Sequence, residues 1–302
     1  MHVDITDLNL FVCIAESPSL TQGAKKAFLS AAAASVRIKS LEEELKTRLF
    51  YRDSKGVELT ASGKKLLKHA RVILRQLEYL KNDFALDKSS DFGHIRIYAN
   101  TTATTEYLPD LLAYYLSHHP GVSVDLKEKQ NAEIIRSVSE GGCDIGIVAG
   151  DVKSKTLEVI RFASDELVLV VPANHPLSNK NSVNFIGALK YPLVSLNDGS
   201  TLVEFLKSES NKVGEALDLR IQVFSFESVL RMVDSGVGVA VVPYSAYERQ
   251  KQFKNVKFIK LDEPWSKRDR YILVRDLNAL PLCAIDLINK ILSDHGINKL
   301  DL

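Results

Sequence analysis

The stretch that decides the fold is Ser19–Gly63, SLTQGAKKAFLSAAAASVRIKSLEEELKTRLFYRDSKGVELTASG. Ser19, with Gln22 three residues later, forms the pattern of a capping box and predicts the start of a short helix. Ser30 predicts the start of a second helix after a tight turn. The segment 51–60 then predicts a hairpin, because turn-forming residues lie between two extended arms. Two helices joined by a tight turn and followed by a hairpin indicate a winged helix-turn-helix.

Two further features complete the expected N-terminal fold. Apolar residues recur at helical spacing before the stretch and predict an amphipathic helix over 5–16, with its apolar face formed by Leu8, Phe11, Val12 and Ala15. Gly23 lies inside the short helix that begins after Ser19, where glycine is about 1 kcal/mol less favourable than alanine. Its presence predicts that another backbone packs closely against it.

The basic residues are concentrated in the same region. Leu20–Arg75 holds 13 Lys and Arg against 5 Asp and Glu, a net charge of +8. Since the whole chain of 302 residues has a formal charge of +1, the remainder must carry −7. A basic segment in an otherwise acidic chain indicates a surface for a polyanion. A solvated helical face explains the charge equally well at this point.

The composition, 45% hydrophobic and 25% charged, is that of a globular protein, and the length predicts about two domains. Asp4, Asp7 and Glu16 do not fit a signal peptide, and no apolar run is long enough to span a membrane. Three widely spaced cysteines do not indicate a disulfide framework. We therefore expect a cytoplasmic protein without a membrane partner.

Four groups of residues resemble the LysR-type transcriptional regulators when taken in order. The first is the pattern L-x-x-F-x-x-x-A-E at Leu8–Glu16. The others are Ser30 with Ser35, Ile38, Leu41 and Glu42; Leu49, Phe50 and Arg52; and Leu59, Thr60 and Gly63. The resemblance continues through the C-terminal two-thirds. It implies a DNA-binding regulator with double-stranded DNA, a small-molecule effector and a second copy of the chain as partners, and RNA polymerase as a further candidate.

A winged helix-turn-helix places the start of its second helix in the major groove, so base contacts are expected from that helix. The remaining contacts go to phosphates. The expected DNA-binding residues are Thr21, Gln22, Lys25, Ser30, Ala31, Ala32, Ser35, Val36, Arg37, Lys39, Arg52, Ser54 and Lys55. Solvation is the alternative role for each cation among them.

The expected reading edge departs from the family pattern at three positions. The family usually has Gln, Pro and Arg where this chain has Ala31, Ala32 and Val36. Few side chains can therefore donate or accept hydrogen bonds to bases. We expect contacts with thymine methyl groups and readout of DNA shape instead.

A long helix is expected from Thr60 to about Leu86. Its apolar residues are spaced alternately by four and three, which is the a/d pattern of a helix–helix seam. The seam consists of Leu66, Ala70, Ile73, Leu77, Leu80 and Phe84. The same stripe could instead pack on its own domain; the resemblance favours a homodimer, or a homotetramer built from dimers.

The C-terminal region alternates predicted strands and helices, which indicates α/β lobes. The expected order is a winged helix-turn-helix (1–60), a linking and dimerisation helix with a hinge (61–93), and a two-lobed effector domain similar to periplasmic binding proteins (94–302). The first lobe would comprise about 94–164 and 269–302, and the second about 165–268.

Ligands of such domains bind in the cleft, at strand ends and helix N-termini. The residues that offer hydroxyls, amides and free backbone N–H groups there are Asn100, Thr101, Thr102, Asn197, Ser200 and Thr201. They suit a small anion, although ordinary helix capping explains them as well. The family resemblance adds Gln130, Asn131, Ala149, Phe226 and Pro243.

Other classes of function find less support. The sequence holds no catalytic motif, so we expect no enzyme, no cofactor and no metal site. A redox-sensing regulator would need a partner cysteine for Cys143, and none lies near it in sequence. A small-solute-binding protein would not need the basic N-terminal region.

Overall fold

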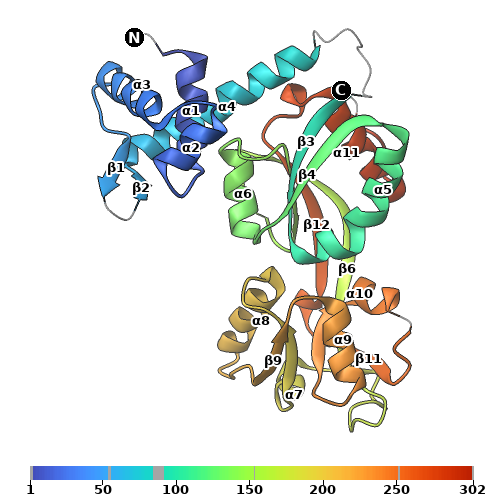
Figure 1. Ribbon diagram of the computed structural model, residues 1–302. Coiled ribbons are helices and arrows are strands. Elements are labelled where there is room, and N and C mark those ends of the chain that lie inside the picture. The colour runs from blue at the N-terminus through green and yellow to red at the C-terminus, as the bar shows by residue number, and fades with distance from the viewer. Residues whose placement is uncertain (1–2, 54–55, 84–91, 153, 251, 301–302) are drawn as a thin grey trace. The chain divides into compact units, whose positions relative to one another are not determined.

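The computed structural model describes residues 3–53, 56–83, 92–152, 154–250 and 252–300. These residues form two compact units, one mainly within residues 1–88 and the other mainly within residues 89–302. Both units appear in Figure 1.

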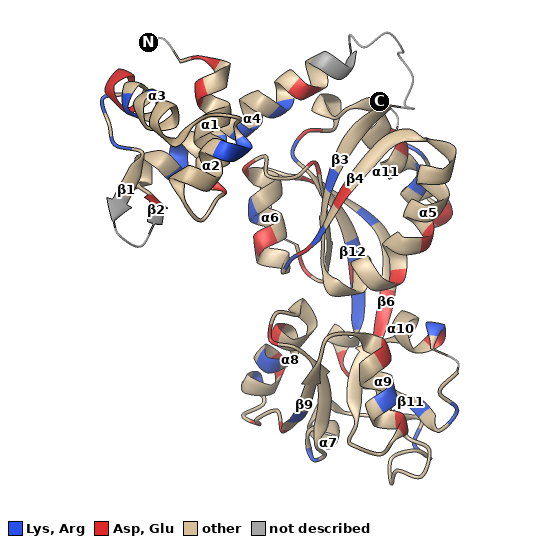
Figure 2. Ribbon diagram, viewed as in Figure 1, with Lys and Arg blue, Asp and Glu red and all other residues tan. Residues whose placement is uncertain are grey.

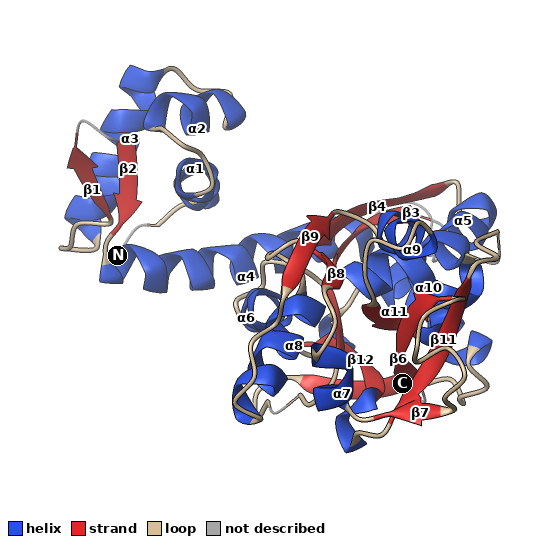
Figure 3. Ribbon diagram, turned by 90° about the horizontal axis from the view of Figure 1, so that it is seen from below, coloured by secondary structure: helices blue, strands red, loops and turns tan. Residues whose placement is uncertain are grey.

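The N-terminal unit is a winged helix-turn-helix extended by one long helix. Its elements are α1 (Ile5–Ala15), α2 (Leu20–Lys26), α3 (Ala31–Glu44), β1 (Phe50–Asp53), β2 (Gly56–Leu59) and α4 (Ala61–Asp83). Figure 3 shows β1 and β2 side by side as the hairpin of the wing, with Phe50 opposite Leu59 and Asp53 opposite Gly56. The predicted caps are present, since the hydroxyls of Ser19 and Ser30 accept bonds from the backbone N–H groups of Gln22 and Ala33.

Gly23 has the predicted close neighbour. A Cβ atom added to it would lie 2.4 Å from Cα of Ile14, so α1 and α2 approach each other backbone to backbone. The close approach explains why a residue that weakens an isolated helix stands in the middle of α2.

Part of the predicted seam on α4 belongs to the core of this unit. Ala70 is fully buried and Leu66 is half-buried, and both pack in the cluster formed by α1, α2, α3 and the wing. The prediction that Ala70 forms an intermolecular seam is therefore wrong, because the first turns of α4 complete the domain's own core; for the half-buried Leu66 it stays a prediction. Ile73 and Leu80, further along, are about half exposed, 47% and 50%.

The C-terminal unit has two α/β lobes joined by two long strands. The first lobe consists of β3 (Phe92–Ala99), a π-helical turn η1 (Ala103–Tyr107), α5 (Leu108–His118), β4 (Gly121–Glu128), α6 (Asn131–Ser139), β5 (Ile145–Ala149), β12 (Lys267–Val274), a 3-10 turn (Leu277–Ala279) and α11 (Leu282–Asp294). Strand β3 pairs in parallel with β4 and β5, and β12 runs antiparallel to β5. Helices α5 and α11 cover one face of the sheet and α6 the other (Figure 1).

The second lobe is built around the distal part of the long strand β6 (Glu158–Pro172). It adds β7 (Ser182–Val183), α7 (Phe185–Leu189), β8 (Leu193–Leu196), α8 (Thr201–Lys212), β9 (Leu219–Val223), α9 (Phe226–Asp234), β10 (Ala240–Pro243), α10 (Tyr244–Arg249), β11 (Val256–Leu261) and a 3-10 turn (Pro264–Ser266). Strands β10 and β11 pair antiparallel with β6, while β8 and β9 form a parallel pair.

Strand β6 belongs to both lobes. Its first half, up to Glu166, pairs with β12, and its second half, from Leu167, forms the centre of the second lobe. In that half, Leu167, Leu169 and Val171 pack on one face of the sheet, and Val168 and Val170 pack on the other. This alternation is the two-residue period of a strand buried on both faces.

Two boundaries in the second lobe have clear physical causes. Strand β6 begins as early as Glu158 because it also pairs with β12. Phe226 is the first residue of α9, because the Ser225 hydroxyl accepts a bond from the N–H of Ser228 and caps that helix.

Candidate effector pocket and DNA-binding surface

A pocket lies in the C-terminal unit where the two lobes meet. It encloses about 410 Å³ of empty space, partly open to solvent. Its lining residues come from the segment before η1, from the start of α8, from the last residues of β5 and β10, and from the strands β6 and β12 that join the lobes: Asn100, Thr101, Thr102, Ala149, Asp165, Leu167, Ser200, Thr201, Leu202, Pro243, Arg268 and Arg270. The strand ends and the helix N-terminus therefore meet here, as expected for α/β lobes.

A chain of hydrogen bonds fixes the polar side of this pocket. The amide nitrogen of Asn100 donates to Oδ1 of Asn131 (3.1 Å), and Nδ2 of Asn131 donates to the Ala149 carbonyl (2.7 Å). The backbone N–H of Asn131 donates to the hydroxyl of Thr201 in the second lobe (3.2 Å). Asn131 thus links both lobes from beside the pocket.

Arg268 brings a positive charge to the pocket, and Asp151 and Glu209 act on it only from a distance. Among the described residues it has no ion pair within 4 Å; Nη2 donates to the Ala149 carbonyl (3.1 Å), and the guanidinium stacks on the Phe205 ring at 3.9 Å. Burial, together with the charge of Arg270, lowers the pKa of Arg268 to about 10. At neutral pH the group is therefore a charged, poorly solvated cation, which is the chemistry of an anion site.

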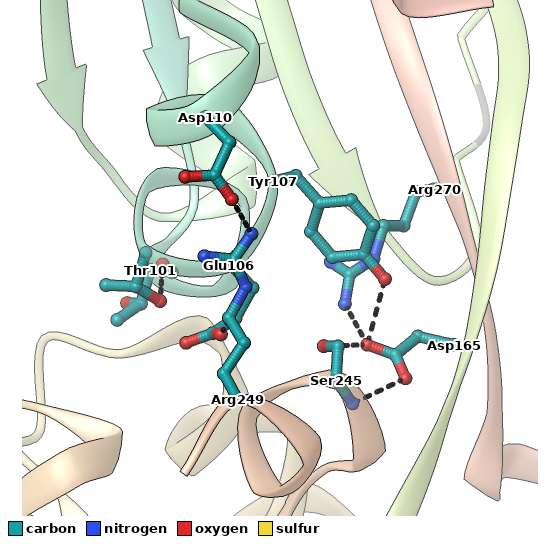
Figure 4. A network of polar contacts seen from close by, with 9 residues as sticks. Thr101, Glu106, Tyr107, Asp110, Asp165, Ser245, Arg249 and Arg270 are labelled. Atoms are coloured by element: carbon teal, nitrogen blue, oxygen red, sulfur yellow. Dashed lines mark hydrogen bonds and ion pairs between the residues drawn. The ribbon is translucent and has the colours of Figure 1, made fainter. Parts of the chain in front are cut away.

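Arg270 is more deeply buried, and only one of its nitrogens forms a strong bond. Nη2 lies 2.7 Å from Oδ2 of Asp165, and the guanidinium lies over the Tyr107 ring at 4.3 Å. Asp165 also accepts bonds from the hydroxyls of Tyr107 (3.1 Å) and Ser245 (2.6 Å), as Figure 4 shows. The buried Nε and Nη1 atoms of Arg270 have no hydrogen-bond partner within the described part of the chain.

The charges at the crossing strands are arranged in pairs. Figure 2 shows a basic stretch of β12 lying beside an acidic stretch of β6 between the lobes. Burial raises the pKa of Asp165, but the charge of Arg270 and the bonds from Ser245 outweigh it and hold that pKa below its usual value. Arg270 and Asp165 together are neutral, so the net charge that remains for a ligand comes from Arg268.

A second ion pair joins the lobes on the other side of Tyr107. Arg249, the last residue of α10, lies 2.6 Å from Oδ2 of Asp110 and 3.5 Å from Oε2 of Glu106 (Figure 4). Burial raises the pKa of Glu106, which lies on the π-helical turn. Helix α10 is therefore tied to the first lobe at its end by Arg249 and near its start by Ser245.

Most of the predicted effector residues line the pocket, and some do not. Asn100, Thr101, Thr102, Ala149, Ser200, Thr201 and Pro243 line it, whereas Gln130, Asn131 and Asn197 are not among its lining residues. Phe226 is 2% exposed in the core of the second lobe, so its prediction as a ligand contact is wrong.

The sequence reasoning missed five lining residues: Asp165, Leu167, Leu202, Arg268 and Arg270. One signal could have revealed the cations. Arg268 and Arg270 alternate along a strand and therefore share a face, at the point where the chain was expected to return to the first lobe.

The predicted base-reading residues of the N-terminal unit are mostly exposed. Thr21, Gln22, Lys25, Ser30, Ala31 and Ala32 are exposed, Val36 is 69% exposed and Ser35 is half-buried. Lys39 is exposed and lies 3.7 Å from Glu43. Ser54 and Lys55 lie outside the described residues, as do the side chain of Arg52 and, on the linking helix, Phe84.

Arg37 has a structural partner that the sequence did not reveal. Its Nε lies 2.7 Å from Asp7 and its Nη2 lies 3.1 Å from Asp4, so it ties α3 to the start of α1. The geometry gives this cation a role inside the domain, and its predicted contact with DNA stays a prediction.

The cysteines lie apart from the pocket. Cys143 and Cys283 are buried in the first lobe, and burial raises the pKa of Cys283 to about 11. A thiol that stays protonated at neutral pH reacts slowly with oxidants. Cys13 is half-buried, and burial raises its pKa as well.

Two family models match the chain. Residues 5–64 match the bacterial regulatory helix-turn-helix of the LysR family, and residues 88–293 match the LysR substrate-binding domain. The chain belongs to the LysR family of transcriptional regulators. It is thus a DNA-binding regulator with an effector-binding domain, and not an enzyme, and the predicted fold class is confirmed.

Individual relatives agree with this assignment. A probable RuBisCO transcriptional regulator of Emiliania huxleyi is 30% identical over 278 residues, 89% of this chain and 88% of the relative. The regulator CzcR of Bacillus subtilis (strain 168) is 32% identical over 248 residues, 81% of each chain. A full-length OxyR variant from Pseudomonas aeruginosa has the same fold, with a TM-score of 0.73 at 21% identity over 97% of this chain and 98% of OxyR.

The LysR-family fold extends to a structure solved with DNA. Full-length CbnR in complex with its target DNA has a TM-score of 0.52 at 19% identity, covering 96% of this chain and 98% of CbnR.

Within the described residues, no helix of this chain combines the length and apolar character needed to cross a membrane.

Proposed function

We propose that this LysR-type regulator responds to a small anionic metabolite held in the pocket between the two lobes. Arg268 and Arg270 bind the anionic group, and the hydroxyls at the start of α8 complete the site. Binding changes the angle between the lobes and thereby the DNA affinity of the protein.

The observation that carries this proposal is the state of the two arginines. Arg270 has two buried nitrogens without a hydrogen-bond partner among the described residues, and Arg268 forms no ion pair within 4 Å there. Buried donors without acceptors are unfavourable, and a bound carboxylate or phosphate would satisfy them with charge-assisted hydrogen bonds. The N-terminus of α8, capped by Ser200, adds a favourable dipole for an anion.

The test is a thermal-shift screen of the full chain. Small carboxylates and phosphates, each paired with its neutral amide or alcohol, are added at millimolar concentration. We expect the anions to raise the melting temperature, because a ligand that binds only the folded state stabilises it. The neutral analogues should leave the melting temperature unchanged.

The variant Arg268→Gln is expected to weaken binding of the best anion about tenfold or more, as befits the loss of one charge-assisted hydrogen bond. Lys207→Gln, which removes an exposed cation paired with Asp198, serves as the matched control and leaves the affinity unchanged. Stabilisation by the neutral analogues, or unchanged anion affinity in Arg268→Gln, would overturn the proposal.

We also propose that the distal part of α4 forms a homodimer seam. The described apolar residues that remain available are Ile73, Leu77 and Leu80, of which Leu77 is half-buried and the others are about half exposed. A parallel or antiparallel pair of such helices would cover this stripe and join two DNA-binding units.

The corresponding prediction concerns Leu80→Asp. A charge in the seam is expected to raise the dimer dissociation constant at least about tenfold, because the carboxylate cannot be buried without a partner. Sedimentation of the full chain measures the effect. Ile186→Asp, at a somewhat less exposed position (41% against 50%) on α7, is the control; an unchanged dimer in Leu80→Asp would exclude the seam.

A further inference from the structure

Phe28 is the most exposed of the large apolar side chains among the described residues, at 96%. It lies in the turn between α2 and α3 and has φ = +56°, in the left-handed region. Its N–H donates to the Lys25 carbonyl and that of Leu29 donates to the Ala24 carbonyl, which is the Schellman arrangement at a helix end. Glycine or asparagine ordinarily occupies this position.

Two features of Phe28 are unfavourable for folding. A bulky side chain in the left-handed region strains the backbone, and a fully exposed ring leaves its apolar surface in water. The neighbouring Leu29, in contrast, packs against the core of the domain. The ring of Phe28 therefore buries almost no surface within its own domain. Its exposure indicates a role in binding.

The surroundings of Phe28 identify the binding partner. Ser30, two residues later, caps α3, the helix expected to enter the major groove, and the exposed Ala31 and Ala32 follow directly. Lys25, in the last turn of α2, is exposed on the preceding side. Phe28 thus continues the apolar edge of the helix that a LysR-type regulator presents to DNA, with a cation beside it.

We propose that Phe28 is a specificity-determining residue that contacts the 5-methyl group of a thymine in the major groove. Phenylalanine, like alanine, recognises thymine through this apolar contact. The ring reaches further than the methyl groups of Ala31 and Ala32, so it extends the apolar reading edge by one base position. This contact is independent of the effector pocket.

The experiment measures affinity of the full chain for a duplex selected by this protein from a random library. Phe28→Asn removes the ring and tolerates the left-handed conformation, whereas Phe28→Tyr keeps the ring. We expect Phe28→Asn to bind about tenfold more weakly, as for loss of a partly buried aromatic side chain, and to melt at a higher temperature. Phe28→Tyr should bind like the wild type.

A double-mutant cycle with the DNA locates the contact. Each thymine of the duplex is replaced in turn by uracil, which removes only the methyl group. One replacement should weaken the wild type several-fold and Phe28→Asn not at all, while the salt dependence stays the same because no cation is lost.

Three results would overturn the inference. They are an unchanged affinity in Phe28→Asn, a thymine-to-uracil effect of equal size in both proteins at every position, and a loss of transcriptional activation with DNA binding intact. The last result would indicate that a protein partner such as RNA polymerase covers the ring.

Discussion

Replacing Arg270 by alanine is expected to lower the free energy of unfolding of the effector domain by about 3 kcal/mol or more, since breaking a buried ion pair leaves an uncompensated charge. Both side chains of the Arg270–Asp165 pair are nearly inaccessible, 3% and 6% exposed. The hydroxyls of Tyr107 and Ser245 would still bond to Asp165, so we expect the lower end of the range for such pairs.

Urea denaturation of the full chain, followed in its C-terminal unit, measures this effect. Arg231→Ala is the control: its ion pair with Glu227 is exposed (65% and 51%), and exposed pairs contribute about 1 kcal/mol or less. The double variant Arg270→Leu with Asp165→Leu should be less destabilised than the sum of the single variants. A loss below about 1 kcal/mol in Arg270→Ala, the range of an exposed pair, would contradict the account of Arg270 and Asp165 as a buried ion pair.

The pH dependence of the same pair has a definite sign. The pKa of Asp165 lies below its usual value of 3.8 in the folded protein. Its stabilising contribution is therefore complete above about pH 4 and is lost as the pH falls through the lower, folded pKa. The wild type should lose stability in that acid range more steeply than the double leucine variant.

Gly23→Ala is expected to destabilise the N-terminal unit and to abolish specific DNA binding. The added Cβ would lie 2.4 Å from Cα of Ile14, a backbone atom that can move only if α1 and α2 separate. Overpacked cores lose typically about 1–3 kcal/mol and occasionally more, and the backbone clash places this variant at about 3 kcal/mol.

The sign of this effect is informative. In a helix without a close neighbour, alanine would be about 1 kcal/mol more favourable than glycine, so a stabilised variant would show that the two helices are not in contact. DNA binding and thermal unfolding of the N-terminal unit give the readout. Gly199→Ala, where the new atom would lie 3.5 Å from Nδ2 of Asn197, should leave both unchanged.

The N-terminal fold could be predicted from the sequence because the residues that specify it act on near neighbours. The hydroxyls of Ser19 and Ser30 cap the helices that follow them within three residues, and the anomalous Gly23 marked the close approach to α1. Such signals depend on hydrogen bonds and contacts formed by neighbours in sequence or by one adjacent helix. The three helices and the wing were therefore predictable from residue types alone.

The sequence predicted the apolar stripe on α4 but not which of its residues pack within their own domain. Spacing of apolar residues by three and four describes a stripe, and it does not distinguish a partner helix from the helix's own domain. Ala70 turned out to be fully buried in its own domain, while Ile73 is half exposed. The division falls where α4 leaves the core, which only the three-dimensional packing determines.

The sequence predicted the pocket residues at the helix ends, and it did not predict the charged residues of the pocket. Asn100 and Ser200 carried local capping signals, and both line the pocket. Arg268, Arg270 and Asp165 meet there because β6 and β12, which are distant in sequence, pair with each other. The alternation of Arg268 and Arg270 is a local pattern, but their pairing with the strand that carries Asp165 became visible only in the structure.

The most direct test of the central claim is a crystal structure of the full chain with the best anion of the screen bound. We predict that its anionic group lies within hydrogen-bond distance of Arg268 and Arg270, with the previously unpartnered nitrogens of Arg270 satisfied. An anion bound elsewhere, with this pocket holding only water, would contradict the assignment of the pocket as the effector site.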